Sequence, residues 1–226
     1  MKKALAALVG LVFVAVSHAA DLGSFTNTDM VTGLKDALNQ GASAAVGKLG
    51  QENGFLGNPK VKIPLPATLQ KAEKAMRTFG MGKQADELVT AMNRAAEAAV
   101  PEAKALLLDS VKKMSVDDAK GILTGGDNAA TQYFRKTTEA PLTTKFLPIV
   151  KQSTQKVGLA EQYNEFAATG SRFGLVKGED AKLENYVTRK ALDGLYLMMA
   201  EEEKALRANP VHAGSALVKK LFSALR

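Results

Sequence analysis

The chain has 226 residues, 46% of them hydrophobic, with a formal net charge of +7 and no cysteine. This length and composition can bury a core, which excludes an intrinsically disordered protein and, without cysteine, a fold held by disulfides. The chain is mildly basic but has no basic run interleaved with aromatic residues, so nucleic acid is not an expected partner.

The first 19 residues have the three parts of a cleavable secretory signal peptide. Two lysines come first, an uncharged apolar run follows, and small residues end the segment. We expect the cut after Ala19, because a cut after Ala20 would place His18 where a small residue is required. A retained anchor is the alternative, but a membrane-spanning helix needs roughly 20 apolar residues. The sequence therefore predicts a periplasmic domain over residues 20–226, with no lipid anchor and no membrane span.

Downstream, hydrophobic periodicity and turn residues predict one helix after another and almost no strand. Asn27, Thr28 or Asp29 offers the N-cap of a helix that ends near Leu49. Residues 50–66 follow as a long irregular stretch, because their glycines and prolines exclude a regular helix. Later helices are expected over residues 67–79, 83–100, 101–114, 115–123, 127–138, 141–157, 159–169, 180–208 and 213–225.

Several of these boundaries depend on particular residues. Pro101 is expected to begin a helix, because its missing N–H would have no partner at that position anyway. Ser115 and Asp118 resemble a capping box that opens the next helix. Pro141 is expected to start a new helix, and Pro148 is expected to kink it.

The longest predicted helix, residues 180–208, has a broad apolar side. An apolar arc of this width indicates a helix that several others contact. No linker or convincing repeat divides the chain. The sequence therefore predicts an all-α, single-domain multi-helix bundle with a long central helix near the C-terminus.

Four long motifs resemble one bacterial family. They are FLGNPKVKIPLP (55–66), MNRAAEAAVPEAK (92–104), ILTGGDNAATQYFR (122–135) and VTRKALDGLYLMMAEEEKALRANP (187–210). Through them the chain, from about residue 31 to residue 222, resembles the bacterial domain of unknown function 4197. The resemblance implies an exported, all-helical protein of the Gram-negative envelope, and it implies no activity, substrate or cofactor.

One polar cluster is the first candidate for a ligand-binding site. Asn93, Arg94 and Glu97 lie within one helical turn, where Arg94 can reach Glu97 at position i+3. Together with Tyr133 and Arg135 they could line a polar pocket between helices. The alternative is a hydrogen-bonded network that fixes how the helices pack.

The irregular stretch is the second candidate, because long loops in compact domains are often functional. It combines apolar residues such as Phe55 with the cations Lys60 and Lys62. Those apolar residues can equally serve to hold the stretch across the bundle.

The remaining clusters favour structural roles. His212 is the only histidine left after cleavage, so we expect no metal site and no cofactor. Asp127, next to two glycines, would repel a phosphate. Residues 201–203, all glutamate, are expected on a solvated face. The basic amphipathic tail, residues 215–226, either lies on an anionic membrane surface or docks on its own domain.

The sequence leaves more than one class of function open. No catalytic constellation stands out, whereas apolar residues, including eight methionines, are abundant and can adapt to ligands. We therefore expect a binding or interaction module for an apolar small molecule, a lipid or an envelope protein rather than an enzyme. The alternatives are a hydrolase of an envelope lipid or polymer, with Glu97 or an aspartate as general base beside Arg94, and a structural envelope protein.

Overall fold

The computed structural model describes residues 26–67, 69–70, 77–78, 82–155, 161, 163–164, 182–210 and 215–224. Within these ranges the chain is helical and contains no strand, which confirms the all-α fold class. Its elements are α1 (Asn27–Leu49), α3 (Gly82–Ala99), the 3-10 turn η2 (Val100–Glu102), α4 (Ala103–Lys113), α5 (Val116–Thr124), α6 (Ala129–Gln155), α8 (Leu183–Ala208) and α9 (Ala216–Ala224). The two helices predicted over residues 67–79 and 159–169 each lie mostly outside the described residues.

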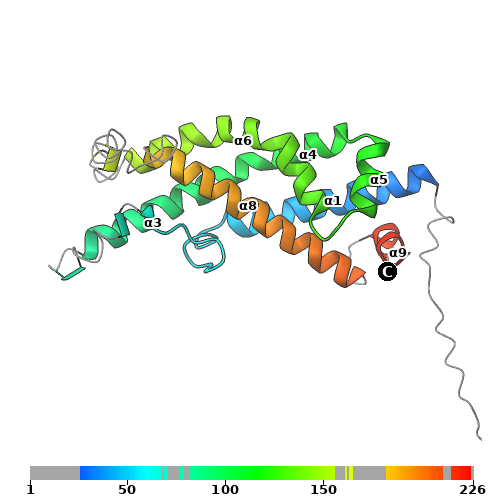
Figure 1. The fold of residues 1–226 in the computed structure, drawn as a ribbon, viewed down its shortest axis with the longest axis horizontal. Coiled ribbons are helices and arrows are strands. Elements are labelled where there is room, and N and C mark those ends of the chain that lie inside the picture. Colours follow the sequence, from blue (N-terminus) through cyan, green and yellow to red (C-terminus); the bar gives the residue numbers. More distant parts are fainter. Residues whose placement is uncertain are drawn as a thin grey trace, which may run out of the picture.

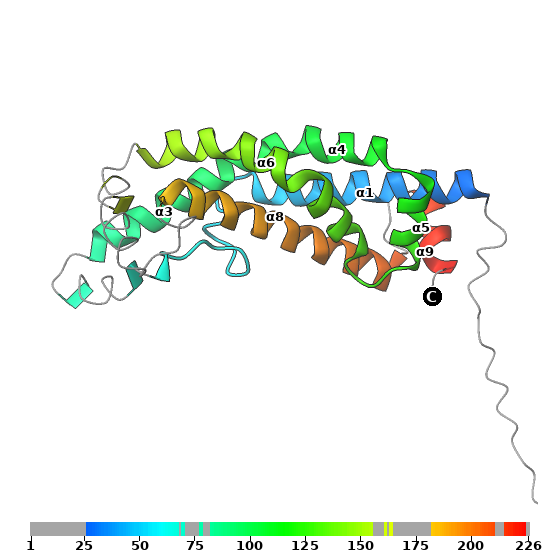
Figure 2. The same cartoon turned by 45° about the horizontal axis from the view of Figure 1, so that its top comes forward.

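The long helices run along one direction, and the short helices α5 and α9 lie at one end (Figures 1 and 2). Helix α8 packs against α1, α3 and α6, and α1 also contacts α4, α5 and α9. The predicted central helix is therefore confirmed. Its apolar arc packs against three neighbours at once. The buried residues of this arc are Leu183, Tyr186, Val187, Ala191, Leu192, Leu195, Tyr196, Met198 and Met199.

Capping boxes set the starts of two helices. At α5, the Ser115 hydroxyl accepts from the Asp118 N–H, and the Asp118 carboxylate accepts from the Ser115 N–H, both at 3.0 Å. This confirms the predicted box. At α1, the same arrangement joins Thr26 and Asp29, so the prediction of a cap at residues 27–29 was wrong. In each box the hydrogen bonds from the capping hydroxyl lower the pKa of the aspartate.

Neither of the two prolines within α6 ends that helix. Helix α6 continues through both Pro141 and Pro148, so the predicted break between residues 138 and 141 was wrong. A proline in a helix interior costs about 3 kcal/mol and bends the axis. Burial of Leu142 and Phe146 offsets this cost by roughly 1.5–3 kcal/mol per side chain. The ribbon of α6 bends in both views (Figures 1 and 2).

Pro101 likewise does not begin a helix. It lies in the 3-10 turn η2 between α3 and α4, and α4 starts only at Ala103. A 3-10 turn also tolerates a residue without an N–H, so the chain passes from one helix to the next with little irregular backbone.

The irregular stretch from Gly50 to Pro66 is held across the bundle by its apolar residues. Phe55, Val61, Ile63 and Leu65 are all buried. The Phe55 ring fits against α8 because residue 194 is glycine: a Cβ there would lie 2.7 Å from the ring carbon Cε1. The stretch is therefore part of the core rather than a free loop.

The C-terminal helix docks on its own domain, the second of the two outcomes expected for the tail. Val218, Leu221 and Phe222 are buried, and Leu217 and Leu221 lie against Gly33 of α1.

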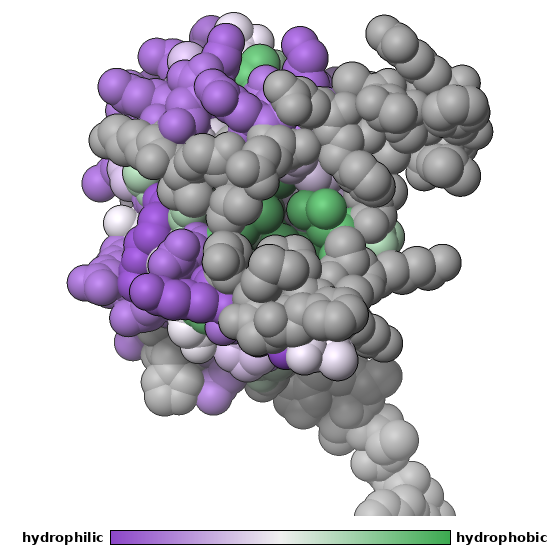
Figure 3. Space-filling model, turned by 90° about the vertical axis from the view of Figure 1, so that its left-hand side faces the viewer, coloured by the Kyte–Doolittle hydropathy of each residue, from purple (hydrophilic) through white to green (hydrophobic). Residues whose placement is uncertain are grey.

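None of the described helices is both long and apolar enough to cross a membrane. Seen from the α3 end, the side chains coloured by hydropathy are mostly hydrophilic, and apolar ones show in the centre (Figure 3).

Candidate functional site

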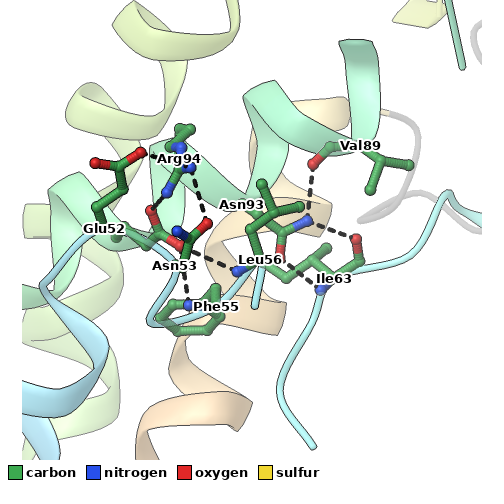
Figure 4. Close-up of polar contacts among 9 residues, drawn as sticks. Glu52, Asn53, Phe55, Leu56, Ile63, Val89, Asn93 and Arg94 are labelled. Carbon is green, nitrogen blue, oxygen red and sulfur yellow. Dashed lines mark hydrogen bonds and ion pairs between the residues drawn. The ribbon is translucent and has the colours of Figure 1, made fainter. Parts of the chain in front are cut away.

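The predicted polar cluster on α3 contacts the irregular stretch. The carboxylate of Glu97, only 5% exposed, accepts hydrogen bonds from the backbone N–H groups of Phe55 (2.9 Å) and Leu56 (3.0 Å) through one oxygen. Its other oxygen pairs with the guanidinium of Arg94. These contacts occupy both oxygens of the carboxylate. Figure 4 shows its partners Phe55, Leu56 and Arg94.

Arg94 extends the network to the start of the stretch. Its second nitrogen donates to the carboxylate of Glu52 (3.1 Å) and to the side-chain oxygen of Asn53 (3.0 Å). Asn53 has a φ of 65°, in the left-handed region, and a Cβ on Gly54 would lie 2.4 Å from the Leu49 carbonyl oxygen. The guanidinium thus holds a tight turn that the backbone alone disfavours.

Asn93 holds the other end of the stretch. Its side-chain oxygen accepts from the Ile63 N–H (2.8 Å), and its nitrogen donates to the carbonyls of Ile63 (2.9 Å) and Val89 (2.7 Å). The side chain is fully buried. A carboxamide presents a donor and an acceptor side by side, so it pairs with the extended backbone as a neighbouring strand would (Figure 4).

We call Asn93, Arg94 and Glu97, with the backbone that they hold over residues 52–63, the loop clamp. The sequence predicted that these three side chains lie close together, and in the structure all three hold the same stretch of chain. Their hydrogen bonds go to the chain itself, which favours the alternative of a packing network. That Asn93, Arg94 or Glu97 also binds a ligand stays a prediction. A general base must reach a substrate proton, and the Glu97 carboxylate is buried and occupied, so the clamp gives no support to a hydrolase.

Tyr133 and Arg135 have other partners. The Tyr133 hydroxyl donates to the Ser110 carbonyl at 2.9 Å and so joins α6 to α4. The Arg135 guanidinium lies 4.6 Å from the centre of the Tyr196 ring and pairs with Asp193 at 3.3 Å. The described contacts of these two side chains do not include the loop clamp, and a pocket lined by all five residues stays a prediction.

The two candidate lysines are on the surface. The Lys60 ammonium pairs with Glu201 at 2.6 Å, and Lys62 is exposed. An exposed pair of this kind contributes about 0–1 kcal/mol. Neither lysine faces a described hollow, and a ligand role for them stays a prediction.

Glu203 corrects the expectation of a solvated glutamate face. Its buried carboxylate accepts from the N–H groups of Ala130 (3.0 Å) and Thr131 (2.9 Å) at the start of α6, and Arg207 pairs with it at 2.9 Å. These bonds provide acceptors for two N–H groups at the start of α6, which have no acceptor within the helix. The one signal in the sequence was Arg207, four residues after Glu203.

A groove that the sequence reasoning missed lies between α1, α8 and α9. Its volume is about 570 Å³. Its walls are mostly small and apolar, with a few polar groups at the rim. The lining residues are Ala37, Gln40, Gly41, Ala44, Glu202, Ala205, Leu206, Ala208, Asn209 and Val218. The signal was the spacing of Ala37, Gly41 and Ala44, which puts small residues on one face of α1.

A smaller cavity of about 40 Å³ adjoins the groove. Both are lined by Ala37, Gly41, Glu202 and Leu206. Deeper walls come from the buried core of five helices, including Leu34, Leu38, Ile122, Phe134, Met199 and Phe222. The groove therefore leads toward an apolar interior.

The part of the chain that the structure describes contains no set of side chains that could bind a metal ion. No three acidic, histidine or cysteine side chains gather there in a way that could hold an ion.

Comparison with protein families gives one match. The model described as "Protein of unknown function (DUF4197)" matches residues 24–223. Curated proteins and solved structures give no match. The matched residues include the loop clamp and the groove, and the description assigns neither of them a role.

Proposed function

Because the chain belongs to the DUF4197 family, whose description assigns no activity, we propose a function from the geometry: an exported envelope protein that binds an apolar ligand. The observation that carries the proposal is the groove between α1, α8 and α9. Its volume of about 570 Å³ lies within the range of roughly 300–1,000 Å³ typical of small-molecule sites.

The chemistry of the groove favours a hydrocarbon chain. Four alanines and one glycine make up half of its lining, Leu206 and Val218 add larger apolar side chains, and Gln40 and Asn209 are its uncharged polar residues. The one charged lining residue, Glu202, is paired with Lys48. A bound chain would gain about 25 cal/mol for each Å² of apolar surface that it removes from water.

The adjoining cavity supports the same proposal. It lies beside the groove; its charged lining residues are Glu202, Glu203 and Arg207, and seven of its fifteen lining residues are leucine, isoleucine, phenylalanine or methionine. Met199, among them, has a flexible side chain that can adjust to a guest. The end of an apolar chain lying in the groove would have this cavity to enter.

Export is part of the proposal and rests on the sequence alone. Two lysines, an apolar run and small residues precede the first described helix. A mature protein that begins at Ala20 would carry the groove into the envelope, where lipids and their fragments are the abundant apolar molecules. Mass measurement of the protein from a native envelope fraction tests this step independently of ligand binding.

Two glycines on α1 allow a matched test of the groove. Gly41 lines it, and a Cβ there meets nothing closer than 3.9 Å; Gly47 lies on the same helix, away from the groove, with nothing within 4 Å. Leucine at residue 41 would project into the groove where the smaller cavity adjoins it, whereas leucine at residue 47 would point to open space. Both changes remove a helix glycine, so their effects on helix stability are similar.

The measurement is thermal unfolding with and without oleate below its micelle concentration. A ligand at 100 times its Kd stabilises the folded state by about 2.7 kcal/mol. We expect oleate to raise the Tm of the wild type and of Gly47→Leu, and to leave that of Gly41→Leu unchanged. An equal shift in all three proteins, or no shift in any, would overturn the proposed site.

A further inference from the structure

The small cavity beside the groove has one cation among its described lining residues, Arg207 near the end of α8. Its side chain is 14% exposed. The groups that contact its guanidinium line the same cavity. Glu203 pairs with it at 2.9 Å, the Ile122 carbonyl accepts from it at 2.8 Å, and the centre of the Phe222 ring lies 5.8 Å away. The guanidinium therefore lies at the wall of the cavity into which the groove leads.

One nitrogen of Arg207 is available to a ligand. Nε donates to Glu203, and Nη2 donates to both Glu203 and the Ile122 carbonyl. Nη1 makes no hydrogen bond to a described residue. It is not shut off from solvent either: among described residues that are not exposed, the unbonded side-chain atoms without access to solvent are Asn39 Oδ1 and Thr188 Oγ1. Two N–H donors of a mostly buried cation can thus be reached by water or by a ligand.

The charges at this end of the groove favour a negatively charged acceptor. Besides the guanidinium, the Glu203 carboxylate accepts from the N–H groups of Ala130 and Thr131 and from the Thr131 hydroxyl. Those N–H groups begin α6, and a helix start carries about half a positive elementary charge. Glu202, the other acidic residue of the cavity wall, is paired with Lys48. The paired charges cancel, and the start of α6 leaves an excess of positive potential.

The cavity has the size of a small polar group. A hollow needs about 10–15 Å³ to hold one water, so the cavity of about 40 Å³ has room for roughly three waters or for one carboxylate. The groove, with a volume of about 570 Å³, is the part that can hold a long chain. Because Ala37, Gly41, Glu202 and Leu206 line both spaces, one molecule can extend from the groove into the cavity.

We propose that the ligand of the groove is a long-chain fatty acid that enters with its carboxylate first. One carboxylate oxygen accepts from Arg207 Nη1, and the hydrocarbon chain runs outward between α1, α8 and α9. A carboxylate taken out of water needs a cation and hydrogen-bond donors, and a guanidinium N–H provides both. This inference rests on the proposed function, to which it adds the class of ligand and the direction in which the ligand lies.

Another cation beside the groove is a poorer partner for the carboxylate. The Lys48 ammonium already lies 2.5 Å from Glu202, and its side chain is 57% exposed. A carboxylate at that position would compete with an existing ion pair in contact with water, where ion pairs contribute little. The two cations therefore distinguish a carboxylate at the inner end from one at the mouth of the groove.

The direct test is NMR of the wild-type protein with oleate, below its micelle concentration, isotope-labelled either at the carboxyl carbon or at the terminal methyl. A soluble paramagnetic chelate broadens the signals of atoms that it can approach. We expect the carboxyl signal of bound oleate to keep its width and the methyl signal to broaden. The opposite pattern would mean that the chain enters methyl end first, which would overturn the inference and leave the proposed groove standing. The absence of any bound signal would overturn both.

A matched pair of substitutions tests the cation. Oleyl alcohol has a chain like that of oleate and no charge, so the ratio of the two affinities measures the contribution of the carboxylate. In the wild type we expect oleate to bind about 10-fold or more tightly than the alcohol. Arg207→Gln should lower this ratio to about 3-fold or less, and Lys48→Gln should leave it unchanged. An unchanged ratio in Arg207→Gln, or an equal fall in both variants, would overturn the inference.

Arg207→Gln also loses the ion pair with Glu203, so its fold needs a check. Its affinity for oleyl alcohol should match that of the wild type and shows that the groove is intact. Gly41→Leu should instead abolish binding of both ligands, so loss of the groove and loss of the cation have different signatures. Should Arg207→Gln fail to fold, the experiment with labelled oleate decides alone.

Discussion

The loop clamp and the groove are opposite solutions to a gap between helices. At the loop clamp, α3 presents buried polar side chains, and the gap is filled by the chain's own residues 52–63. At the groove, α1 and α8 present alanine and glycine, and the gap stays open. The polar cluster that looks like a site from the sequence is closed, and the opening lies where the sequence looks plain.

The difference follows from the backbone. A buried irregular segment has N–H and C=O groups that must find partners, and Asn93 and Glu97 provide them. Two helices satisfy their own backbone groups, so small residues between them leave a space with no unpaired polar atom. A polar cluster therefore marks where the chain needs support, and a row of small residues marks where volume can remain.

The largest expected effect comes from breaking the loop clamp. Glu97→Ala leaves two backbone N–H groups and one face of Arg94 without an acceptor, so we expect the free energy of unfolding to fall by about 3 kcal/mol. Glu52→Ala is the control, because that glutamate is exposed and should cost less than about 0.5 kcal/mol. Denaturant titration measures both. Equal costs would mean that the clamp does not hold the stretch.

The buried Tyr196 hydroxyl between α6 and α8 makes the stability of a second closed, polar contact depend on pH. Burial raises the pKa of Tyr196 to about 12, although Thr138 holds its hydroxyl at 2.9 Å. The unfolded pKa is about 10, so between these values the folded state keeps a proton that the unfolded state loses. This contribution to stability is complete below pH 10 and falls as pH rises toward 12, by roughly 2–3 kcal/mol.

Tyr196→Phe isolates the contribution of that hydroxyl. The variant loses about 1 kcal/mol at neutral pH with the hydrogen bond, and its stability should decline less than that of the wild type above pH 10. Denaturant titrations at several alkaline pH values compare the two slopes. Parallel slopes would show that the Tyr196 hydroxyl is accessible to water.

A smaller effect is expected where Phe55 meets α8. Gly194→Ala places a Cβ 2.7 Å from the phenylalanine ring, and overpacking of this kind costs about 1–3 kcal/mol. Phe55→Leu in the same chain should recover part of that loss, because it removes the clashing ring. A Gly194→Ala protein as stable as the wild type would mean that the ring does not seat the stretch against α8.

The smallest effect distinguishes an open groove from a packed one. Alanine in place of a helix-interior glycine stabilises by about 0.5–1 kcal/mol when there is room for the methyl group. We expect this gain for both Gly41→Ala and Gly47→Ala, since neither Cβ meets an atom closer than 3.9 Å. Thermal unfolding of the two variants checks it, and a loss at Gly41 alone would mean that the groove is closed in solution.

Local chemistry in the sequence predicted much of the fold. The capping box at Ser115 and the broad apolar arc of α8 follow from residue type and spacing. The meeting of Arg94 and Glu97 follows from their spacing on one helix.

What the sequence could not predict depends on distant partners. Helix α6 continues through Pro141 because its buried face compensates the proline. The Glu203 side chain is only 7% exposed because the start of α6 lies beside α8. The groove exists only after α1, α8 and α9 have met, so no window of the sequence contains it.

Native mass spectrometry of the mature protein, purified from the envelope without detergent, tests the account most directly. We predict that wild type and Gly47→Leu both carry an apolar molecule and that Gly41→Leu does not, each with a polypeptide mass that begins at Ala20. A wild-type protein free of any bound molecule, or one that keeps it equally in Gly41→Leu, would contradict the claim that the groove is the binding site.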